Sequence, residues 1–417
     1  MVQGGEKITV LYVDQAVAFG GAVVVIGCLV EAIDKSHFRP IVVGEMDASI
    51  LQNHINGHAE LFVIPRLFNY ALWAKTVKSI TRFPGSLPRK LAIYTLSAVR
   101  GLANMVYGLR LAKLILREGV VIVHVNNGMS NLAPVIVAIL LRRRCIVHFH
   151  GMEKPGLFQR LFIQKVSRFI AVSEYLKKSL VENHIPENRI DIIHNPVRFK
   201  AVRPGTRDRV RDQYGIEPGQ HVFGIVGRIV RWKGHVEFLK AADIVFKSVP
   251  EAKGLIIGDF SDGDSSYQSS ITRMIKESEY SEKIIMTGYV ENVEDLYSIM
   301  DVCVHASIDP EPFGLVITEA MAHGVPVIAS DRGAPREIIN DGVDGFLVDP
   351  VASDQLASAI IALLSDETLR QRIGNRGRER IQKDFRASTY WHAIENVYIE
   401  VMGGNQSPSD APERQKL

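Results

Sequence analysis

The sequence predicts an α/β protein built from two doubly wound domains. Strand-like runs alternate with helical patterns along the chain, which is typical of parallel sheets covered by helices on both faces. The 417 residues exceed what one ordinary hydrophobic core serves, so two domains are expected. A polar break with a proline, His194-Asn195-Pro196-Val197, interrupts the alternation near the middle and places the boundary there.

The first half contains seven apolar, β-branched runs separated by polar or helical segments. They are Ile8–Val13, Pro40–Gly44, Leu61–Ile64, Val120–Val125, Cys145–Phe149, Phe169–Val172 and Ile190–Ile193. Near-continuous apolar runs of this length are typical of parallel strands, which are buried on both faces. They predict a Rossmann-like domain over residues 1–195.

The second half contains six further runs of the same kind. They are His221–Val226, Lys253–Ile257, Lys283–Thr287, Val302–His305, Val327–Ser330 and Gly345–Val348. Helical patterns such as His235–Lys247 and Ser353–Leu364 separate them. They predict a second Rossmann-like domain over residues 196–385, entered through a hinge at the break and the polar stretch Lys200–Asp212.

The end of the chain predicts one more helix and then a tail. Apolar residues recur at helical spacing from Ser388 to Val401, so we expect a helix over residues 386–402 that packs back toward the first domain. Residues 403–417 are rich in Gly, Pro, Ser and charge, a composition that predicts disorder.

Composition and targeting signals narrow the class of protein. A hydrophobic fraction of 47% and a charged fraction of 23% are those of a globular protein. Cys28, Cys145 and Cys303 lie singly in apolar surroundings, so we expect reduced, structural thiols. The apolar run Phe19–Val30 is too short to span a bilayer and no signal peptide precedes it, so a cytoplasmic protein is expected.

The formal net charge of +3 hides an uneven distribution. Residues 1–200 carry 25 Lys and Arg against 13 Asp and Glu, and the remainder carries 24 against 33. Leu61–Arg117 holds ten basic residues and no acidic one, with aromatic residues between them. Such a surface attracts anionic lipid headgroups, an acidic saccharide or nucleic acid. A solvated basic helical face over a core explains the same pattern, and the residues alone leave both interpretations open.

The stretch from Asp301 to Ser330 carries most of the chemistry. It reads as a buried strand, a Pro/Gly-rich loop, a helix from about Leu315 and a second buried strand. Phe313-Gly314 then lies at a helix N-terminus, where backbone N–H groups and the helix dipole favour an anion. Glu311 lies on the loop and Glu319 about one turn into the helix. A phosphate seat flanked by two acceptors of hydroxyl hydrogen bonds suits a nucleotide-sugar.

A second anion-binding pattern opens the second half. The strand that ends near Val226 is followed by GRIVRWKG, a glycine-flanked turn that feeds a helix. Arg228 offers a planar fork for a diphosphate, and Lys233 a mobile point charge. Alone, the pattern is better explained as a surface turn with incidental charges. Together with the Glu311–Glu319 block it gives two cations and a helix N-terminus for one anion.

The combination resembles the retaining glycosyltransferases of family four, which have the GT-B fold of two Rossmann-like domains facing each other across a cleft. The resemblance spans about residues 8 to 400. The segments that carry it are GRIVRWKG, EPFGLVITEAMAHGVPVIAS, AVSEYLKKSL from Ala171, the glycine loop Phe19–Ala22, the turn Asp331–Pro335 with Glu337, and Asn340–Gly342 before Gly345–Val348.

The resemblance implies a donor site in the second half. Arg228 and Lys233 would hold the donor diphosphate and stabilise the leaving nucleotide. Glu311 would contact the donor sugar, and Glu319 would accept hydrogen bonds from the ribose hydroxyls. Backbone N–H groups would lie near the phosphate and the sugar; they belong to Gly314, Leu315 and Val316.

The remaining implied contacts lie on both halves. Tyr289 and Val290 would flank the base, Gly20 and Gly21 would let the backbone approach the diphosphate, and His150 would line the reacting centre. Without the resemblance, His150 reads as a core histidine at a strand end and the two glycines as a turn. The match also departs from the family at Arg198, where an acidic residue is common, and at Gly258-Asp259-Phe260, which lacks a second glycine.

No metal or cofactor is expected. Asp262-Gly263-Asp264 has the spacing of a metal-binding carboxylate pair but lies in a Ser/Gly-rich loop. The His54 and His58 pair lacks a third ligand. Neither a P-loop nor a G-x-G-x-x-G fingerprint is present, which argues against ATPase and dehydrogenase functions. We therefore expect a metal-independent enzyme whose donor is a substrate rather than a cofactor.

The sequence thus favours a retaining hexosyltransferase that uses a UDP- or GDP-type sugar. The acceptor would be a glycan or a lipid-linked glycan in cell-surface polysaccharide or glycolipid biosynthesis, and no nucleic-acid partner is expected. Residues 61–117 would bring the protein to an anionic membrane, peripherally at its inner face. Two alternatives stay open: a nucleotide-sugar epimerase, hydrolase or phosphorylase on the same fold, and a non-catalytic binding module.

Overall fold

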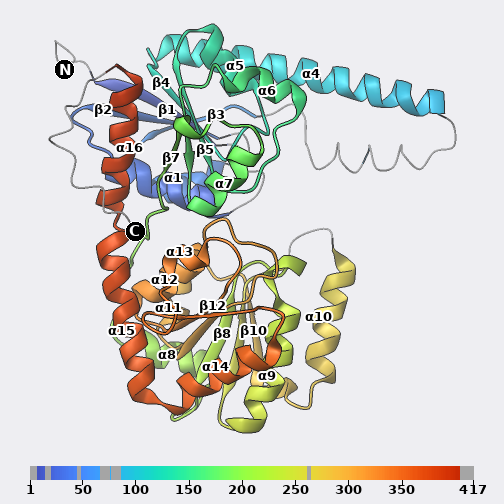
Figure 1. The fold of residues 1–417 in the computed structure, drawn as a ribbon, viewed down its shortest axis with the longest axis vertical. Coiled ribbons are helices and arrows are strands. Elements are labelled where there is room, and N and C mark those ends of the chain that lie inside the picture. The colour runs from blue at the N-terminus through green and yellow to red at the C-terminus, as the bar shows by residue number, and fades with distance from the viewer. Residues whose placement is uncertain are drawn as a thin grey trace. The chain divides into compact units, whose positions relative to one another are not determined.

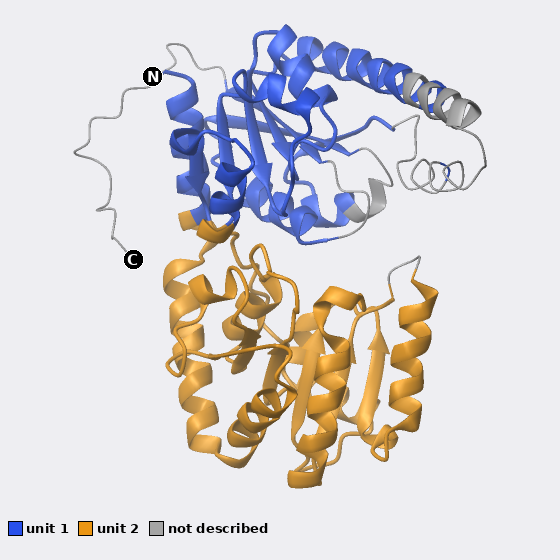
Figure 2. Cartoon of the chain, turned by 45° about the vertical axis from the view of Figure 1, so that its right-hand side comes forward, with its two compact units in different colours: residues 1–172, 176–193, 390–417 blue, residues 173–175, 194–389 orange. Residues whose placement is uncertain are grey.

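A computed structural model of the chain describes residues 7–14, 20–44, 48–65, 76, 86–260 and 264–403. Its contacts divide the chain into two units (Figure 2). Unit 1 comprises residues 1–172, 176–193 and 390–417, and unit 2 comprises residues 173–175 and 194–389. Each unit holds one wholly parallel sheet with helices on its faces (Figure 1), so the expected α/β architecture is confirmed.

The sheet of unit 1 has seven strands in the order β3-β2-β1-β4-β5-β6-β7. The strands are β1 (Ile8–Asp14), β2 (Phe38–Gly44), β3 (Glu60–Val63), β4 (Ile122–Asn126), β5 (Arg144–Phe149), β6 (Arg168–Ala171) and β7 (Ile190–Ile192). The order reverses between β1 and β4. At that point Asp14 pairs in register with Asn126, and Asn126 with His148, so three polar residues share the carboxyl edge of the sheet.

Helices cover both faces of this sheet because their apolar sides need burial. They are α1 (Gly21–Ala32), α2 (Ala48–Ile55), α4 (Ser86–Arg117), α5 (Ala133–Leu140), α6 (Leu157–Ile163), α7 (Glu174–Glu182) and the short 3₁₀ helix η1 (Glu187–Arg189). The long helix α4 packs on α5 and buries Tyr107, Leu111 and Ile115. Its opposite side is exposed at Leu102 and Leu109.

The sheet of unit 2 has six strands in the order β10-β9-β8-β11-β12-β13. The strands are β8 (Val222–Val226), β9 (Lys253–Ile257), β10 (Ile284–Gly288), β11 (Val302–His305), β12 (Val327–Ser330) and β13 (Phe346–Val348). The order reverses between β8 and β11. In open α/β sheets, ligands bind outside the carboxyl ends of the strands at such a reversal.

The helices of unit 2 pack around a core that includes Phe223, Phe238 and Phe246, whose rings lie 5.5–5.6 Å from centre to centre. They are α8 (Thr206–Gln213), η2 (Arg231–Lys233), α9 (His235–Ser248), α10 (Ser265–Glu277), η3 (Ser281–Lys283), α11 (Val293–Tyr297), α12 (Leu315–Ala322), α13 (Pro335–Ile338), α14 (Ser353–Ser365) and α15 (Glu367–Asp384). Helix α16 (Ala387–Val401) follows and belongs to unit 1 from Tyr390 onward.

The stretch expected to form a polar hinge is only partly irregular. Residues 206–213 of it form helix α8, which buries only Thr206 and Val210. So few buried positions leave no apolar periodicity to read, which explains why the sequence did not indicate this helix. The expected tail lies outside the described residues from position 404 onward, and so do residues 66–75 and 77–85 of the basic stretch.

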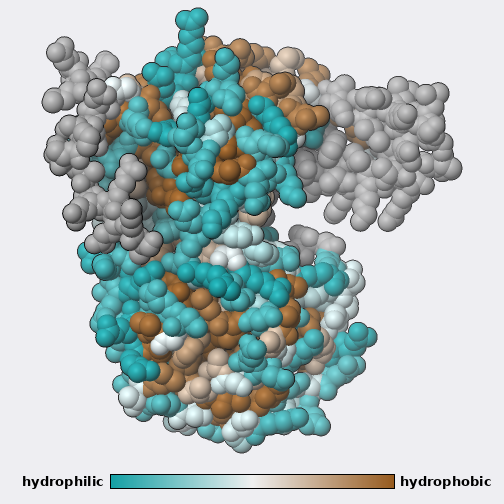
Figure 3. All heavy atoms as spheres, viewed as in Figure 1, coloured by the Kyte–Doolittle hydropathy of each residue, from teal (hydrophilic) through white to brown (hydrophobic). Residues whose placement is uncertain are grey.

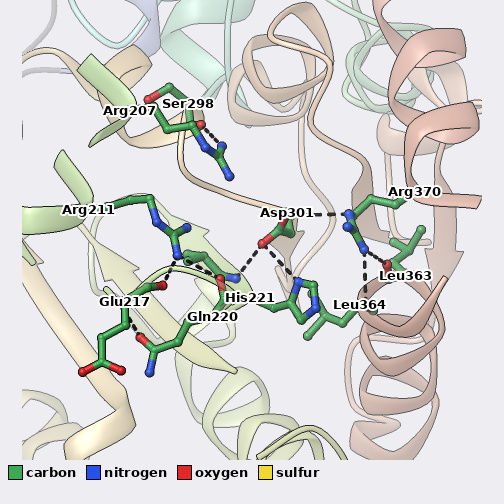
Figure 4. Close-up of polar contacts among 11 residues, drawn as sticks. Arg207, Arg211, Glu217, Gln220, His221, Ser298, Asp301, Leu363, Leu364 and Arg370 are labelled. Carbon is green, nitrogen blue, oxygen red and sulfur yellow. Dashed lines mark hydrogen bonds and ion pairs between the residues drawn. The ribbon is translucent and has the colours of Figure 1, made fainter. Parts of the chain in front are cut away.

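A polar network ties the amino-terminal edge of the unit 2 sheet to the helices beneath it (Figure 4). Asp301, just before β11, accepts a hydrogen bond from the Val222 N–H at 2.8 Å and donates its own N–H to the Val222 carbonyl at 2.7 Å. The Arg370 Nε lies 3.6 Å from the Asp301 carboxylate. Arg370 also donates to the carbonyls of Leu363 and Leu364 at the end of α14. One carboxylate therefore joins two strands and two helices.

Replacing Asp301 by alanine should destabilise unit 2. The substitution leaves the Arg370 guanidinium without its carboxylate and the Val222 N–H without its side-chain acceptor, which costs about 1–3 kcal/mol in the free energy of unfolding. Urea unfolding followed by circular dichroism measures the change. Asp208→Ala, at an exposed position of α8, is the matched control. Equal stability of the two variants would show that the network is not needed.

Candidate functional site

Four of the predicted residues lie in the two segments that follow β8 and β11 in unit 2, with Lys233 in η2 and Glu319 in α12. Arg228 and Lys233 follow β8, and Glu311 and Glu319 follow β11. Since β8 and β11 are hydrogen-bonded neighbours where the strand order reverses, both loops emerge at the same point of the sheet edge. The structure joins Lys233 directly to Glu311.

The Glu311 carboxylate is buried, with 7% of the residue exposed, and accepts three hydrogen bonds. The donors are the Lys233 Nζ at 2.6 Å, the His305 Nε2 at 3.0 Å and the Ser307 Oγ at 3.0 Å. All three reach the same oxygen, Oε2. Burial alone would raise the pKa of Glu311, but the Lys233 charge and the His305 hydrogen bond hold it well below its ordinary value. Glu311 is therefore ionised and held in one orientation.

The backbones of the two loops approach each other closely beside the Lys233–Glu311 pair. Gly234 has a positive φ of 74°, and a Cβ there would lie 1.9 Å from the Ala306 carbonyl oxygen. The Ile308 N–H donates to the Trp232 carbonyl at 2.8 Å, which bonds the two loops together. The Lys233 Nζ lies 4.1 Å from the centre of the Trp232 ring, within the range of a cation–π contact. At position 234, only glycine allows the loop to come this close to the Ala306 carbonyl.

The N-terminus of α12 presents backbone donors beside the pair. Gly314 occupies the N-cap position with φ 107° and offers no side chain to cap the helix. The first N–H groups of a helix have no intrahelical partner, so those of Leu315 and Val316 can bind an acceptor. The loop before them is fixed by the buried Phe313 and by Ser173, whose Oγ donates to the Pro312 carbonyl at 2.7 Å.

Glu319 lies one turn into α12 and has a different environment. Its Oε2 accepts a hydrogen bond from the Tyr297 hydroxyl at 3.3 Å, and the Tyr297 ring stacks on His323. Burial raises the pKa of Glu319 to about 7, with the Tyr297 hydrogen bond opposing and Glu294 adding to the rise. Unlike Glu311, this carboxyl has no cation paired with it among the described residues.

The other predicted donor contacts of unit 2 are Arg228, in the loop after β8, and Tyr289 and Val290, farther along the sheet edge. Arg228 is exposed and forms no ion pair with any described residue. Tyr289 is 61% exposed and Val290 half-buried, and both follow β10, the edge strand two places from β8. The structure thus places Tyr289 and Val290 at the same edge but does not join them to the Lys233–Glu311 pair.

Sequence reasoning missed two members of this site. His305 reads as the last residue of a buried strand, and Ser307 as a loop residue. Two polar residues at the end of an apolar strand, four and six positions before a glutamate, were the available signal. Sequence reasoning also gave Glu337 no role, although its carboxylate accepts the N–H groups of Glu174 and Tyr175, both at 2.8 Å.

The predicted residues of unit 1 gather at the carboxyl edge of β1, β4 and β5. The Asn126 Oδ1 accepts a hydrogen bond from the His150 Nε2 at 2.8 Å, and its Nδ2 donates to the Ala22 carbonyl at 3.2 Å and to Asp14 at 3.4 Å. Asn126 therefore links His150 to the start of α1. Gly20 is the N-cap of that helix and Gly21 its first residue, and a Cβ at Gly20 would meet no atom of the described residues within 4 Å.

The two candidate metal pairs have other structural roles or partners. Asp264 caps α10 by accepting the Tyr267 N–H at 3.0 Å, and it pairs with Arg231 at 2.7 Å, while residues 261–263 lie outside the described residues. The His58 Nδ1 lies 3.2 Å from the Lys35 Nζ. Across the described part of the chain, no three His, Cys, Asp or Glu side chains are grouped to hold a metal ion.

A search of the described helices for one long and apolar enough to cross a bilayer finds none.

Stability should depend on pH through Glu319. Its pKa of about 7 lies above the ordinary 4.5, so between these values the folded protein holds a proton that the unfolded chain has released. Its contribution is fully present below the ordinary pKa and is lost as the pH rises toward 7. The stability of the wild type relative to Glu319→Gln should fall by about 1–3 kcal/mol between about pH 4.5 and pH 7.5. Urea titrations across this range measure it, and a constant difference would contradict the raised pKa.

Comparison with known proteins places this chain in a family. Residues 206–380 match the family described as Glycosyl transferases group 1, and residues 19–201 match Glycosyltransferase Family 4. The capsular polysaccharide biosynthesis glycosyltransferase CapM of Staphylococcus aureus is 26% identical over 328 residues, 75% of this chain and 83% of CapM. The N-acetyl-alpha-D-glucosaminyl L-malate synthase of Bacillus anthracis is 25% identical over 304 residues, 70% of this chain and 78% of the synthase.

A solved structure shares the fold over nearly the whole chain. The Anabaena protein HepE, solved in complex with UDP-glucose, superposes with a TM-score of 0.76 at 20% identity, covering 94% of this chain and all of HepE. The two family matches together take in most of both units. The chain belongs to the glycosyltransferases, with a Family 4 region followed by a group 1 region.

Proposed function

We propose that the protein transfers a sugar from a nucleotide-diphosphate sugar to a glycan or lipid-linked acceptor, with retention at the anomeric carbon. The observation that carries the proposal is the Lys233–Glu311 ion pair at the strand-order reversal of unit 2, beside the N-terminus of α12. A buried carboxylate beside a lysine and a helix N-terminus suits a ligand that carries both an anionic group and hydroxyl groups.

The charges favour a diphosphate at this point. The Lys233 ammonium has three donors, and Glu311 takes one of them, so two remain for phosphate oxygens. The Leu315 and Val316 N–H groups and the Arg228 guanidinium supply further donors from two other directions. As the bond to the sugar breaks, negative charge grows on the leaving diphosphate, so these donors act most strongly in the transition state.

The state of the two glutamates supports retention by a front-face substitution. Glu311 commits Oε2 to three side chains and stays ionised, so it is no proton donor, and its Oε1 is left to accept a sugar hydroxyl. Glu319 lies on the helix with Tyr297 and suits the ribose hydroxyls. Because both glutamates are assigned to holding the donor, no obvious nucleophile for a double displacement remains. The leaving phosphate itself would then deprotonate the acceptor, with no metal ion required.

The relatives support the class of donor and acceptor. HepE was solved with UDP-glucose, and CapM is named for capsular polysaccharide biosynthesis. A UDP- or GDP-type donor and a cell-surface glycan or glycolipid acceptor are in keeping with both. Tyr289 and Val290 would flank the base, Gly20 and Gly21 the diphosphate, and His150 the donor sugar. An epimerase or hydrolase would consume donor without an acceptor, so acceptor dependence of donor turnover separates the alternatives.

The donor site is tested by Lys233→Met. Loss of a charged donor to phosphate should weaken binding of UDP-glucose or GDP-mannose, whichever the wild type binds, by about tenfold or more in calorimetry. Lys240→Met, at an exposed position of the adjoining helix α9, is the matched control and should bind as the wild type does. Because Lys233→Met leaves Glu311 unpaired, the double variant Lys233→Met with Glu311→Gln separates lost binding from lost folding. Unchanged affinity in both variants would show that the donor binds elsewhere.

We propose that unit 1 associates peripherally with an anionic membrane. Helix α4 exposes the apolar residues Leu102, Met105 and Leu109 at helical spacing on one side, with Arg110, Lys113 and Arg117 also exposed. Helix α6 exposes Leu157, Phe158 and Leu161, by 84%, 62% and 68%. In Figure 3, apolar side chains gather over the part of unit 1 where Figure 1 shows α5 and α6. Apolar residues beside basic ones favour an anionic lipid surface.

Vesicle cosedimentation tests this surface. The protein should bind phosphatidylglycerol vesicles at low salt and lose most binding at high salt. Leu157→Ser with Leu161→Ser should weaken binding by about tenfold or more, since each buried leucine contributes about 1.5–3 kcal/mol. Val343→Ser with Val351→Ser removes two exposed apolar side chains from unit 2 as a control. Equal failure to bind anionic and neutral vesicles would remove the membrane from the proposal.

A further inference from the structure

A chain of buried polar side chains runs through unit 1 from helix α16 to the sheet edge that carries His150. The Tyr398 hydroxyl donates to the Tyr12 hydroxyl at 3.0 Å and lies 2.7 Å from the His124 Nδ1. The His124 Nε2 in turn lies 3.3 Å from the His148 Nδ1. Tyr12, Tyr398 and His148 are fully buried, and His124 is 1% exposed. The helix that supplies Tyr398 lies 274 residues beyond His124 in the sequence.

The hydrogen bonds can run in one of two directions along this chain. If Tyr398 donates to Tyr12, its oxygen accepts from His124, and both histidines then carry their proton on Nδ1. If Tyr398 instead donates to His124, both histidines carry their proton on Nε2. The His148 Nε2 is buried with no hydrogen-bond partner among the described residues. The first direction leaves only a lone pair there, whereas the second leaves a buried N–H unpaired, which costs about 1–3 kcal/mol.

Burial also keeps both histidines neutral. It lowers the pKa of His124 to about 3 and the pKa of His148 well below its ordinary value, with the neighbouring histidines adding to both shifts. A neutral imidazole has one donor and one acceptor nitrogen, so each ring passes on the direction it receives. The tautomer of His148 is therefore determined by the hydroxyl at the far end of the chain.

The series of hydrogen-bonded side chains that begins at Tyr398 ends beside His150. The His148 and His150 rings lie 4.2 Å apart from centre to centre with 33° between their planes. His150 is held on its other side by Asn126, which accepts its Nε2 proton at 2.8 Å. A change in the tautomer of His148 reverses the ring dipole under His150 and puts an unpaired N–H beside it. The position of the His150 ring therefore depends on the tautomers of the hydrogen-bonded histidines.

We propose that Tyr398 of the C-terminal helix is a positioning residue for His150, acting by fixing His124 and His148 as Nδ1–H tautomers. That this matters for sugar transfer rests on the proposed function, in which His150 lines the reacting centre. The tautomers themselves and the position of the His150 ring do not depend on that function.

The test is Tyr398→Phe, which removes the hydroxyl that accepts from His124. Without that hydroxyl, the Nδ1–H tautomers leave a buried His124 N–H unpaired, just as the Nε2–H tautomers leave a buried His148 N–H unpaired. The preference is then lost, so both rings should populate both tautomers. Nitrogen chemical shifts of ¹⁵N-histidine-labelled full-length protein report each tautomer, with His124, His148 and His150 assigned through single His→Gln substitutions. The ring signals of His150 should move as well.

Tyr390→Phe is the matched control. Tyr390 lies on the same helix, is 4% exposed, and stacks on His148 at 6.5 Å, but its hydroxyl has no hydrogen-bond partner among the described residues. It removes the same atom from the same neighbourhood without touching the chain. It should leave all three histidine signals in place. Nε2–H tautomers in the wild type, or unchanged tautomers in Tyr398→Phe, would overturn the proposal.

Activity then separates this proposal from the proposed function. Tyr398→Phe should lower kcat for sugar transfer by about tenfold or more, because a small displacement of a reacting group is costly, while the KM for the donor stays within about twofold. Tyr390→Phe should match the wild type. Mixed tautomers with an unchanged kcat and an unmoved His150 would overturn the positioning role. A wild-type protein that transfers no sugar, with mixed tautomers and a moved His150 in the variant, would refute the proposed function alone.

Discussion

The buried charge of Glu311 is the constraint on which the donor edge of unit 2 depends. A carboxylate removed from water is tolerated only when cations and hydrogen-bond donors replace its hydration. Here the replacements come from three segments: Lys233 after β8, His305 at the end of β11, and Ser307 on the loop that follows. Satisfying one carboxylate thus fixes the two loops that emerge where the strand order reverses.

That constraint passes into the backbone. Gly234 lets the β8 loop lie against the Ala306 carbonyl, and Gly333 lets a third loop lie against Glu311, where a Cβ would come within 2.5 Å of the Glu311 carbonyl oxygen. The Ala334 N–H then donates to that carbonyl at 2.9 Å. The buried carboxylate thus brings the loops close together. At these two positions there is no room for a side chain, so glycine is needed. The N-terminus of α12 lies beside Glu311, since a Cβ at Gly314 would come within 3.6 Å of the Glu311 Cγ. The N–H groups of Leu315 and Val316 there have no intrahelical partner.

Much of this arrangement could be predicted from sequence because it depends on local patterns. Apolar runs and glycine-flanked turns placed Arg228, Lys233, Glu311 and Glu319 after the correct strands. His305 was missed because an apolar run shows that its last residue is buried but not what it faces. Tyr398 was missed for the same reason. It reads as one apolar position of an amphipathic helix, and its partners, His124 and Tyr12, are distant in sequence. Local periodicity gives the buried face of a helix, whereas the partner of a buried polar atom is a property of the tertiary fold.

The two units therefore use different chemistry to hold polar side chains at the edge of a sheet. Each carries its polar side chains at a reversal of strand order, but unit 2 uses an ion pair and unit 1 uses neutral rings and an amide. The ion pair supplies a charged donor for an anion, while the histidine rings and the amide fix the direction of hydrogen bonds. The network of unit 1 also requires α16, whose Trp391 and Tyr398 pack against Phe38 at 5.3 and 5.9 Å. Since α16 follows every helix and strand of unit 2 in the sequence, unit 1 cannot complete its polar edge until those elements have been made. The edge that carries His150 is therefore assembled after unit 2 has its full sequence, although most of unit 1 precedes it.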